Sequence, residues 1–452
     1  MLLRFGVSNH RSIRDYQELI LTASSLKDRG EGLLTTSANS ESAKHLNVLP
    51  VIAIYGSNAA GKSTILKAFN FYVAAILRSH SRSASRVGTP YHPFALDNDS
   101  KHLPSTYDSD FVIDDTRYHY GFSLDGEKVV AEWLYSFNLN SSRQVRSILF
   151  HRDSAQNPEY YFGKGLKGEN KQISKLTRPS VLFLSSAAQN SHPLISQIYE
   201  YFLEKISLRL SSPETPEAIA SQIYAYFGED SDRRERAVTF LKAADIGISG
   251  IDFSRIPIEE RTRVLLGEFE KVLSKHLADN KFSLTGEKDQ ANVEFYHTGF
   301  GGSKYPVKLA DESSGTLSLL QLLGPMLNSL AIGGVLLIDE LNMTLHPLVS
   351  LELVRVFSSK ETNPNGAQLV FSTHDSSILG TDLLRRDQVW FVEKSDDGSS
   401  SFYSLAEIKI RSGDNFEKGY MQGRFGAVPL FKLYREDLIK VSDLNVASEG
   451  PR

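Results

Sequence analysis

Runs of apolar residues separated by polar turns extend along the chain, and their spacing predicts a mixed α/β fold. Val48 to Tyr55 is apolar and rich in β-branched residues, which predicts a buried strand. Thr64 to Phe69 carries apolar residues at helical spacing. The glycine-containing stretch between the two therefore predicts a strand, a tight loop and a helix in direct succession.

The N-terminal half also contains patterns of short strands. Leu2 to Thr22 predicts two strands around the turn Asn9 to Ser12. From about residue 106 to 165 the pattern has period two, with a hairpin turn at Asp125-Gly126, which predicts an antiparallel sheet. We interpret the aromatic residues in this stretch as half-buried sheet residues.

The second half begins with another apolar run. Ser180 to Leu184 predicts a buried strand that ends at Gln189. Residues 190 to about 280 then have mostly helical patterns, at Ile195 to Leu208, Pro216 to Phe227 and Arg261 to Leu277. A strand is predicted at Val293 to His297, and strand and helix patterns alternate from there on. Such alternation is typical of a parallel sheet with crossover helices.

The loop before Thr64 has the residues of a phosphate-binding loop. Its glycines let successive backbone N–H groups point inward at phosphate oxygens, and the following helix adds its N-terminal partial charge. Lys62 is expected to reach the β- and γ-phosphates, and the Ser63 hydroxyl is expected to ligate Mg²⁺. The predicted nucleotide-binding residues of the loop are Gly56, Ser57, Asn58, Ala59, Ala60, Gly61, Lys62, Ser63 and Thr64.

Two acids follow a second apolar strand, Gly333 to Ile338. In phosphate-loop enzymes the first acid, here Asp339, holds Mg²⁺ directly or through water. Glu340 is then placed to polarise the attacking water as a catalytic base. A solvated strand end is the alternative interpretation of this pair.

Three further segments add candidate site residues. Ser313 and Gly315 lie in a turn that opens an apolar helix, which indicates either an anion site or an ordinary helix cap. His374 follows the apolar run Gln368 to Phe371 and can hydrogen-bond a γ-phosphate or the attacking water. Gln189, at the end of its predicted strand, could reach the metal or the water, or be ordinary surface polarity.

Composition places the chain among globular proteins. Of its 452 residues, 41% are hydrophobic and 23% are charged, which is typical of a folded protein with two or three domains. There are no cysteines, so thiolate metal sites and cysteine nucleophiles are excluded. No run approaches the length of a membrane span, no signal peptide is evident, and we expect a cytoplasmic protein. The net charge of -4 gives no general attraction to nucleic acid, although a local basic patch is possible.

The order of these motifs resembles the ATPase head of the ABC superfamily, in its SMC and RecF-like branch. It is most similar to bacterial ATPases of the overcoming-lysogenisation (OLD) and abortive-infection type, through Glu312 to Thr316, Asp339-Glu340, Leu345 to Pro347 and Phe371 to Asp375. The opening Phe5 to Ser12 is also similar, with His10 where an aromatic is usual. His346 stands where transporter heads carry Asp, so transporter chemistry is not carried over for this loop. The separation of 277 positions from Lys62 to Asp339 favours a head with inserted segments.

The resemblance implies an α/β P-loop NTPase of the ABC head type, with an antiparallel β-subdomain and an inserted helical subdomain. We expect a first half of the head at 1–190, a helical insert at 191–285, a second half at 286–400 and an extension at 401–452. It further implies a homodimer or higher oligomer around two ATP, with Mg²⁺, in which Ser313 and Gly315 close the site of the partner copy. Absence of an Asn-Lys-x-Asp motif, which reads guanine, is consistent with ATP.

The sequence says less about the cellular role that ATP hydrolysis would serve. The resemblance implies a regulatory or sensor ATPase of an anti-phage system, with a separately encoded nuclease or toxin as effector. The alternatives are a DNA-repair ATPase that binds DNA, or an OLD-like ATPase with a reduced nuclease region around Glu393, Asp396 and Asp397. Residues 413–429 resemble the tail of effector-linked ATPases, or form a loop that caps the sheet edge.

Overall fold

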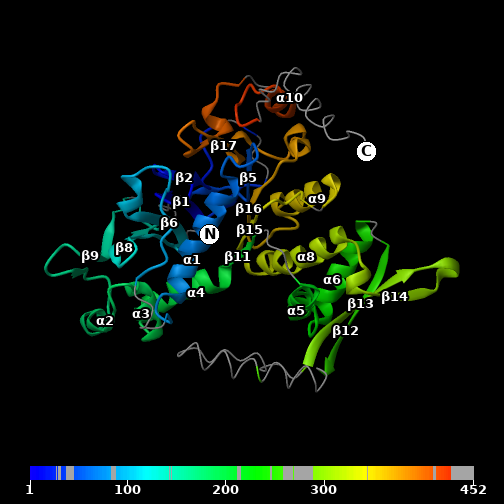
Figure 1. Cartoon of the computed structure of the whole chain (residues 1–452), viewed down its shortest axis with the longest axis horizontal. Coiled ribbons are helices and arrows are strands. Elements are labelled where there is room, and N and C mark those ends of the chain that lie inside the picture. Colours follow the sequence, from blue (N-terminus) through cyan, green and yellow to red (C-terminus); the bar gives the residue numbers. More distant parts are fainter. Residues whose placement is uncertain are drawn as a thin grey trace, which may run out of the picture.

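The computed structural model is built around two large sheets with helices between and beside them (Figure 1). It describes residues 1–26, 28, 32–36, 45–82, 88–141, 143, 145–210, 215–244, 247–257, 268, 289–343, 345–410 and 414–428.

The central sheet has six strands in the order β11-β15-β16-β5-β17-β18. Its first five strands are parallel and only β18 runs antiparallel, so the predicted parallel sheet is confirmed. Alternate residues of one strand serve two cores: Ile52 and Ile54 face one side, and Val51, Ala53 and Tyr55 face the other. The strands are β5 (Val51–Gly56), β11 (Ile206–Arg209), β15 (Val335–Ile338), β16 (Gln368–Ser372), β17 (Val389–Lys394) and β18 (Ser400–Ser404).

A seven-stranded antiparallel sheet, in the order β10-β9-β8-β7-β6-β1-β2, covers one side of this core. It confirms the two opening strands and the antiparallel region at 106–165. Its strands are β1 (Leu2–Ser8), β2 (Gln17–Ile20), β6 (Ser105–Ile113), β7 (Thr116–Leu124), β8 (Val129–Asn138), β9 (Ser147–Asp153) and β10 (Tyr160–Phe162).

Helix α1 (Lys62–Arg78) lies between the two sheets (Figure 1). Its Phe69 and Tyr72 pack on Phe5 of β1, while its Ile65 shares the same core with Ile54 of β5. Helix α4 (Pro193–Lys205) packs beside α1 in this layer. The strand, loop and helix predicted around the phosphate loop are therefore confirmed, although Pro50 separates β5 from the short β4 (Asn47–Val48).

The other face of the central sheet is covered by helices and a small sheet. The helices are α5 (Pro216–Phe227), α6 (Ser231–Ala243), α8 (Ser314–Ile332) and α9 (Pro347–Ser358). The small sheet consists of β12 (Ile248–Pro257), β13 (Asp289–Thr298) and β14 (Lys304–Lys308), which pair antiparallel.

The expectation of a mostly helical segment from 190 to 280 is partly wrong. Residues 206–209 leave the predicted helix and join the central sheet as β11, because they pair with β15. Residues 248–257 form β12, whose Ile251 packs in the core with Phe295 of β13. The helix predicted at Arg261 to Leu277 lies outside the described residues, apart from Glu268, which is helical. The division into four segments stays a prediction.

The strand predicted at Ser180 to Leu184 is wrong, because this run enters helix α3 (Phe183–Gln189). A short apolar run does not distinguish a strand from a buried helix. Glu132 on β8 favours the helix, because its carboxylate accepts hydrogen bonds from Phe183 N and Leu184 N at 2.6 and 2.9 Å. These are N–H groups that a helix start leaves without an internal acceptor.

Helix α8 is long and apolar enough, by length and composition alone, to cross a membrane. The expectation that no stretch approaches such a length is therefore wrong for Ser314–Ile332. Half of the helix is buried within the protein, and its Leu320 and Leu323 lie in the core beneath the central sheet. This is the environment of a core helix.

Residues 414–428 pack against the central sheet and include the short helix α10 (Phe416–Met421). Tyr420 stacks on Phe391 of β17, and Ala427 N donates to Glu393 Oε1 at 2.7 Å. The segment thus caps the sheet edge, as the structural alternative for this tail predicts.

Candidate functional site

The loop from β5 to α1 makes its closest approach to neighbouring strands at two glycines. A Cβ on Gly56 would lie 2.6 Å from the Val392 carbonyl oxygen, and one on Gly61 would lie 2.3 Å from Ser400 Oγ. Gly61 also has a φ of +117°, a conformation that side chains disfavour. Both positions therefore require glycine, as the phosphate-loop interpretation expects.

Lys62 begins α1 and is buried, with its ammonium folded back on its own loop. Its Nζ donates to the carbonyl oxygens of Gly56 and Ser57 at 3.1 and 3.2 Å. A third contact, of 2.8 Å, joins it to His374 Nε2. Burial lowers the pKa of Lys62 from its ordinary value, against the charges of the nearby acids. No carboxylate is among the three hydrogen-bond partners, so the ammonium remains available to an anion that enters the loop.

Asp339 follows β15 and lies directly beside the loop. Its Oδ1 accepts hydrogen bonds from Ser63 Oγ at 2.9 Å and from Ser372 Oγ at 2.7 Å. A carboxylate and a serine hydroxyl this close together are the oxygen donors that Mg²⁺ takes in nucleotide sites. The donor set present therefore fits a magnesium ion held by Ser63 and Asp339, as predicted.

His374 lies between Lys62 and Glu340. Its Nε2 is 2.8 Å from Lys62 Nζ and 3.4 Å from Glu340 Oε1. One ring nitrogen cannot accept from the lysine and donate to the glutamate at once. The ring lies closer to Lys62 than to Glu340. The neighbouring His374 and the charge of Lys62 hold the pKa of Glu340 below its usual value, against the opposing effect of burial.

Sequence reasoning missed four side chains that hold this arrangement. Ser400 Oγ donates to Ala60 O at 2.6 Å and accepts from Ser12 Oγ at 2.8 Å, and the hydroxyls of Ser12 and Thr64 are hydrogen-bonded at 3.0 Å. Ser372 accepts from Glu340 N, and Asn342 accepts from the turn at His374. Ser372 ends β16, and Asn342 follows the end of β15 by four residues. A polar residue at or soon after the end of a buried strand is the signal that could have found both.

Ser313 and Gly315 lie at the N-terminus of α8. Ser313 Oγ caps the helix by accepting from Thr316 N at 3.1 Å, and the first turn carries no acid. The Ser313 side chain is exposed, and no described hydrogen bond or ion pair joins it to Lys62 or Asp339 in the same copy. A cavity of about 200 Å³ lies farther along α8, between Gln321 and the Asp339-Glu340 pair. The helix start and the acid pair thus belong to the same side of the molecule.

The sequence comparison now decides the family. A family model described as "AAA domain, putative AbiEii toxin, Type IV TA system" matches residues 51–380, which include the loop, both acids and His374. The chain belongs to this family. It is a P-loop ATPase related to abortive-infection proteins, so the predicted relationship and the α/β P-loop fold are confirmed.

Solved structures similar to this ATPase include SMC heads. An SMC head domain from Thermotoga maritima has 12% sequence identity and a TM-score of 0.37, and the match covers 90% of this chain and 99% of that one. An Smc head domain with a coiled coil and joint from Pyrococcus yayanosii has 11% identity and a TM-score of 0.36, covering 94% and 99%. No curated protein matches the chain.

Gln189 does not lie near Lys62, Asp339 or His374. It ends α3 instead of a strand and is exposed. Helix α3 packs at the C-terminal end of α1, where His80 N donates to Ser185 Oγ and Leu182 N donates to Ser79 Oγ. The 17 residues of α1 separate this end from the phosphate loop by about 25 Å. The placement assumed for Gln189 is therefore wrong, because it depended on the strand that the chain does not form.

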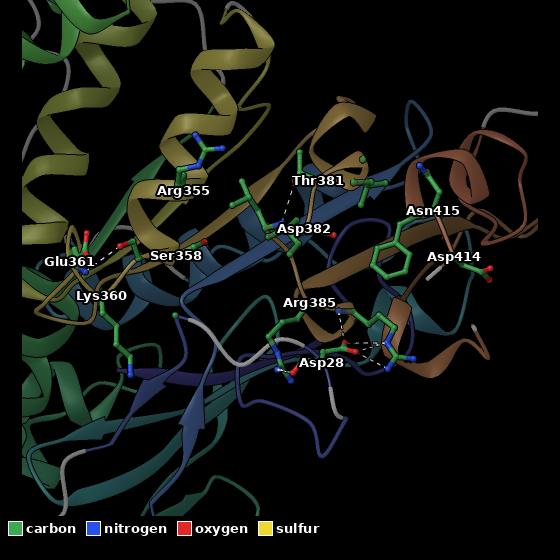
Figure 2. Close-up of a pocket in the computed structure, with 18 residues that line it drawn as sticks. Asp28, Arg355, Ser358, Lys360, Glu361, Thr381, Asp382, Arg385, Asp414 and Asn415 are labelled. Atoms are coloured by element: carbon green, nitrogen blue, oxygen red, sulfur yellow. Dashed lines mark hydrogen bonds and ion pairs between the residues drawn. The ribbon is translucent and has the colours of Figure 1, made fainter. Parts of the chain in front are cut away.

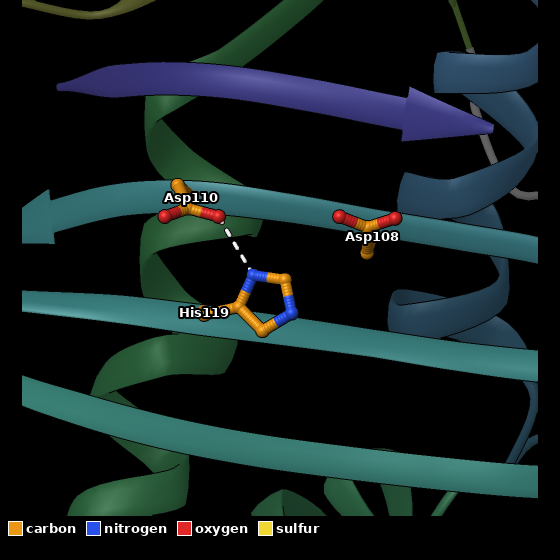
Figure 3. A group of neighbouring side chains, drawn as sticks. All are labelled: Asp108, Asp110 and His119. Atoms are coloured by element: carbon orange, nitrogen blue, oxygen red, sulfur yellow. Dashed lines mark hydrogen bonds and ion pairs between the residues drawn. The ribbon is translucent and has the colours of Figure 1, made fainter. Parts of the chain in front are cut away.

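A second group with metal-ligand spacing lies on the seven-stranded sheet and consists of Asp108, Asp110 and His119 (Figure 3). The place of a cation is taken there by Arg4, whose Nη2 donates to Asp108 and, at 3.1 Å, to Asp110. The His119 ring is also committed, to Asp110 at 2.7 Å and to Trp133 Nε1 at 3.0 Å. We assign no metal to this group.

Two of the three acids proposed for a reduced nuclease region have structural partners. Glu393 accepts from Ala427 N, and Asp397 pairs with Arg14 at 2.6 Å. Within the described part of the chain, none of the three belongs to a group of three or more metal-ligating side chains.

The larger of two described cavities, about 1230 Å³, lies away from the phosphate loop, between the end of α9 and residues 379–386 (Figure 2). Its walls are polar, and many of their charges are neutralised within the protein. The pairs are Arg386 with Asp28, Arg385 with Asp387, Arg355 with Glu352 and Asp414 with Arg424. Walls so balanced do not select a ligand by charge, and we assign none.

Proposed function

We propose that the protein hydrolyses ATP at the cluster of Lys62, Ser63, Asp339, Glu340 and His374. The observation that carries the proposal is their meeting at the carboxyl ends of three neighbouring parallel strands, β5, β16 and β15. In open α/β sheets this edge is where ligands bind. The family membership supports the nucleotide, and the absence of a guanine-reading motif supports adenine.

Each side chain has a role that follows from its contacts. Lys62 leaves its carbonyl partners for the β- and γ-phosphates, and the N–H groups of the loop and of the start of α1 bind the remaining oxygens. Ser63 and Asp339 would hold a Mg²⁺, whose charge would offset that of the phosphates. Glu340, ionised at neutral pH because its pKa is low, accepts a proton from the attacking water. The water oxygen bonds to the γ-phosphorus, the bond to the β–γ bridging oxygen breaks, and His374 hydrogen-bonds the γ-phosphate.

We also propose that two copies form the complete site. No described hydrogen bond or ion pair joins Ser313 to Lys62 or Asp339 of its own copy. The N–H groups of the first turn of α8 other than that of Thr316, which Ser313 caps, fit the γ-phosphate of a facing copy. Loop and helix start would then come from different copies, giving two ATP per dimer. Such a dimer would act in the cytoplasm.

Mixing two inactive variants tests the shared site. Lys62→Met removes the phosphate contact, and Ser313→Arg blocks the helix start with a bulky cation. In a mixed dimer one site carries both defects and the other carries neither, so about half of the parental turnover per mixed dimer is expected to return on mixing. We would measure phosphate release for each variant alone and for the mixture across protein concentrations. Absence of recovery, with mixed dimers shown by two affinity tags, rejects the shared site.

The family description names an abortive-infection toxin and a toxin–antitoxin system, which supports a role beyond hydrolysis. We propose that this role is exerted through a separately encoded effector protein. We propose that ATP-driven closure of the two copies holds or releases that effector. The DNA-repair alternative predicts turnover that duplex DNA stimulates with steep salt dependence. Turnover unchanged by duplex DNA between 50 and 200 mM salt, with growth arrest that requires the neighbouring gene, would favour the effector role.

A further inference from the structure

Asn342 lies two residues beyond Glu340 and bridges the segments that follow β15 and β16. Its Oδ1 accepts hydrogen bonds from Thr373 Oγ1 at 2.8 Å and from His374 N at 3.2 Å. Because a backbone N–H can only donate, the carbonyl end of the amide must face this turn. We propose that Asn342 is a positioning residue that holds His374 between Lys62 and Glu340, an inference that rests on the proposed ATP hydrolysis.

The backbone around Glu340 brings Asn342 to this place. Glu340 has a φ of +58°, which is uncommon for a residue with a side chain. The surrounding bonds fix that conformation: Glu340 N donates to Ser372 Oγ at 2.8 Å, and Leu341 N donates to Ser372 O at 3.0 Å. Strain held in this way is found at functional sites. Here it keeps the chain after β15 beside the end of β16 and places Asn342 against His374.

The backbone N–H of His374 is hydrogen-bonded to Asn342, whereas the residue before it is held by β5. Thr373 N is held by Ile54 O at 3.0 Å, and Thr373 Oγ1 also accepts from Asp375 N at 3.0 Å. Among the described residues, Asn342 provides the acceptor for His374 N. The backbone before His374 is thus hydrogen-bonded to β5 through Thr373, while His374 itself is hydrogen-bonded to Asn342, which follows β15.

Small displacements of His374 would matter because its ring makes two competing contacts. Nε2 is 2.8 Å from Lys62 Nζ and 3.4 Å from Glu340 Oε1, and the side chain is about one-third exposed. A ring that is partly in solvent is not fixed by packing alone. Without Asn342 the ring can leave both partners, and misplacement by about 1 Å lowers turnover on the order of tenfold to a hundredfold.

Asn342→Ala tests this with two readouts. We expect kcat for ATP to fall about tenfold or more, while the Kd for a non-hydrolysable ATP analogue changes less than about threefold. Asn342 can affect the nucleotide only through His374, and Lys62 and the loop, which bind the phosphates as well, are unchanged. Asn342→Asp keeps an acceptor at the same place and should recover most of the lost kcat. In addition, ¹⁵N signals of the His374 ring, assigned by their loss in His374→Gln, should move in Asn342→Ala without nucleotide.

Asn365→Ala is the matched control. Asn365 also uses its side-chain amide to bind backbone, donating to Leu330 O and Ala331 O at 3.0 Å, but it lies before β16, at the other end of the strand from His374. We expect parental kcat and unchanged His374 signals for this variant.

The outcomes separate the two proposals. Parental kcat in Asn342→Ala, or a loss in Asn342→Asp as large as that in Asn342→Ala, overturns the positioning role. If the parent protein shows no ATP hydrolysis, the proposed function fails, and the ring signals alone decide about Asn342. Signals of His374 that do not move in Asn342→Ala then reject the inference.

Discussion

Two regions of the molecule combine a cation, two carboxylates and a histidine: Lys62 with Asp339, Glu340 and His374, and Arg4 with Asp108, Asp110 and His119. The second group lies on the interior strands of the antiparallel sheet. Although burial alone would lower the pKa of Arg4, the charge of Asp108 beside it raises that pKa. Burial likewise would raise the pKa of Asp110, but the hydrogen bond from His119 and the charge of Arg4 lower it.

In the first group the cation is less well compensated. Lys62 binds two carbonyl oxygens and a ring nitrogen, and burial lowers its pKa. β5, β15 and β16 end here, so these side chains lie beyond the carboxyl ends of the strands and not among the strands of a sheet. Similar side chains stabilise the fold where their charges neutralise one another. Where the fold leaves a cation without a paired carboxylate, the cation is available to bind an anion.

The largest expected difference between the two groups comes from changing one carboxylate in each to an amide and measuring ATP hydrolysis. Glu340→Gln removes the proposed base and should slow ATP hydrolysis by about 10²–10⁴-fold. Binding of ATP should persist, because Lys62 and the loop are unchanged. Phosphate release and the Kd for nucleotide measure the two effects.

Asp110→Asn is the matched control, since it makes the same chemical change in the group that Arg4 neutralises. We expect the folded variant to hydrolyse ATP at the parental rate. Parental turnover in Glu340→Gln would show that Glu340 is not the base.

Removing the arginine tests the structural group. Arg4→Met leaves Asp108 buried without its charge partner and should lower the free energy of unfolding by about 3 kcal/mol. Urea unfolding measures this loss, and ATP turnover per folded molecule should not change. Arg14→Met breaks an exposed pair with Asp397, which water screens, and should lower the free energy of unfolding much less. Equal losses in the two variants would contradict the assignment of Arg4 to a buried network.

The sequence predicted which side chains meet at the carboxyl ends of the strands, because strand ends locate side chains. Asp339, Glu340 and His374 each follow a buried strand, and parallel strands bring their carboxyl ends together. The phosphate loop has a local sequence pattern, and the strand before it and the helix after it are both present. The role of each residue stays a prediction, but the geometry that the predictions required is present.

What the sequence did not predict depends on distant contacts. Helix α3 forms where a strand was expected, because Glu132, some fifty residues earlier in the chain, accepts from its first N–H groups. Ser400 braces the loop although 339 residues separate it from Gly61, and no local pattern marks it. Arg4 has a similar dependence, since its partners become neighbours only when β1 pairs with β6.

The smallest effect concerns the free energy that Lys62 costs the protein when no nucleotide is bound. Because burial lowers the pKa of Lys62, the unfolded chain binds more protons than the folded one between that lowered pKa and 10.5. Stability of the parent should therefore rise with pH through this window, apart from other groups. Lys62→Met lacks this dependence and should be as stable as the parent or slightly more stable near neutral pH, with the difference shrinking toward pH 10.5. Urea unfolding of both proteins from pH 7 to 10.5 measures the trend, and a variant less stable than the parent at pH 7 would place Lys62 with Arg4 among the structural cations.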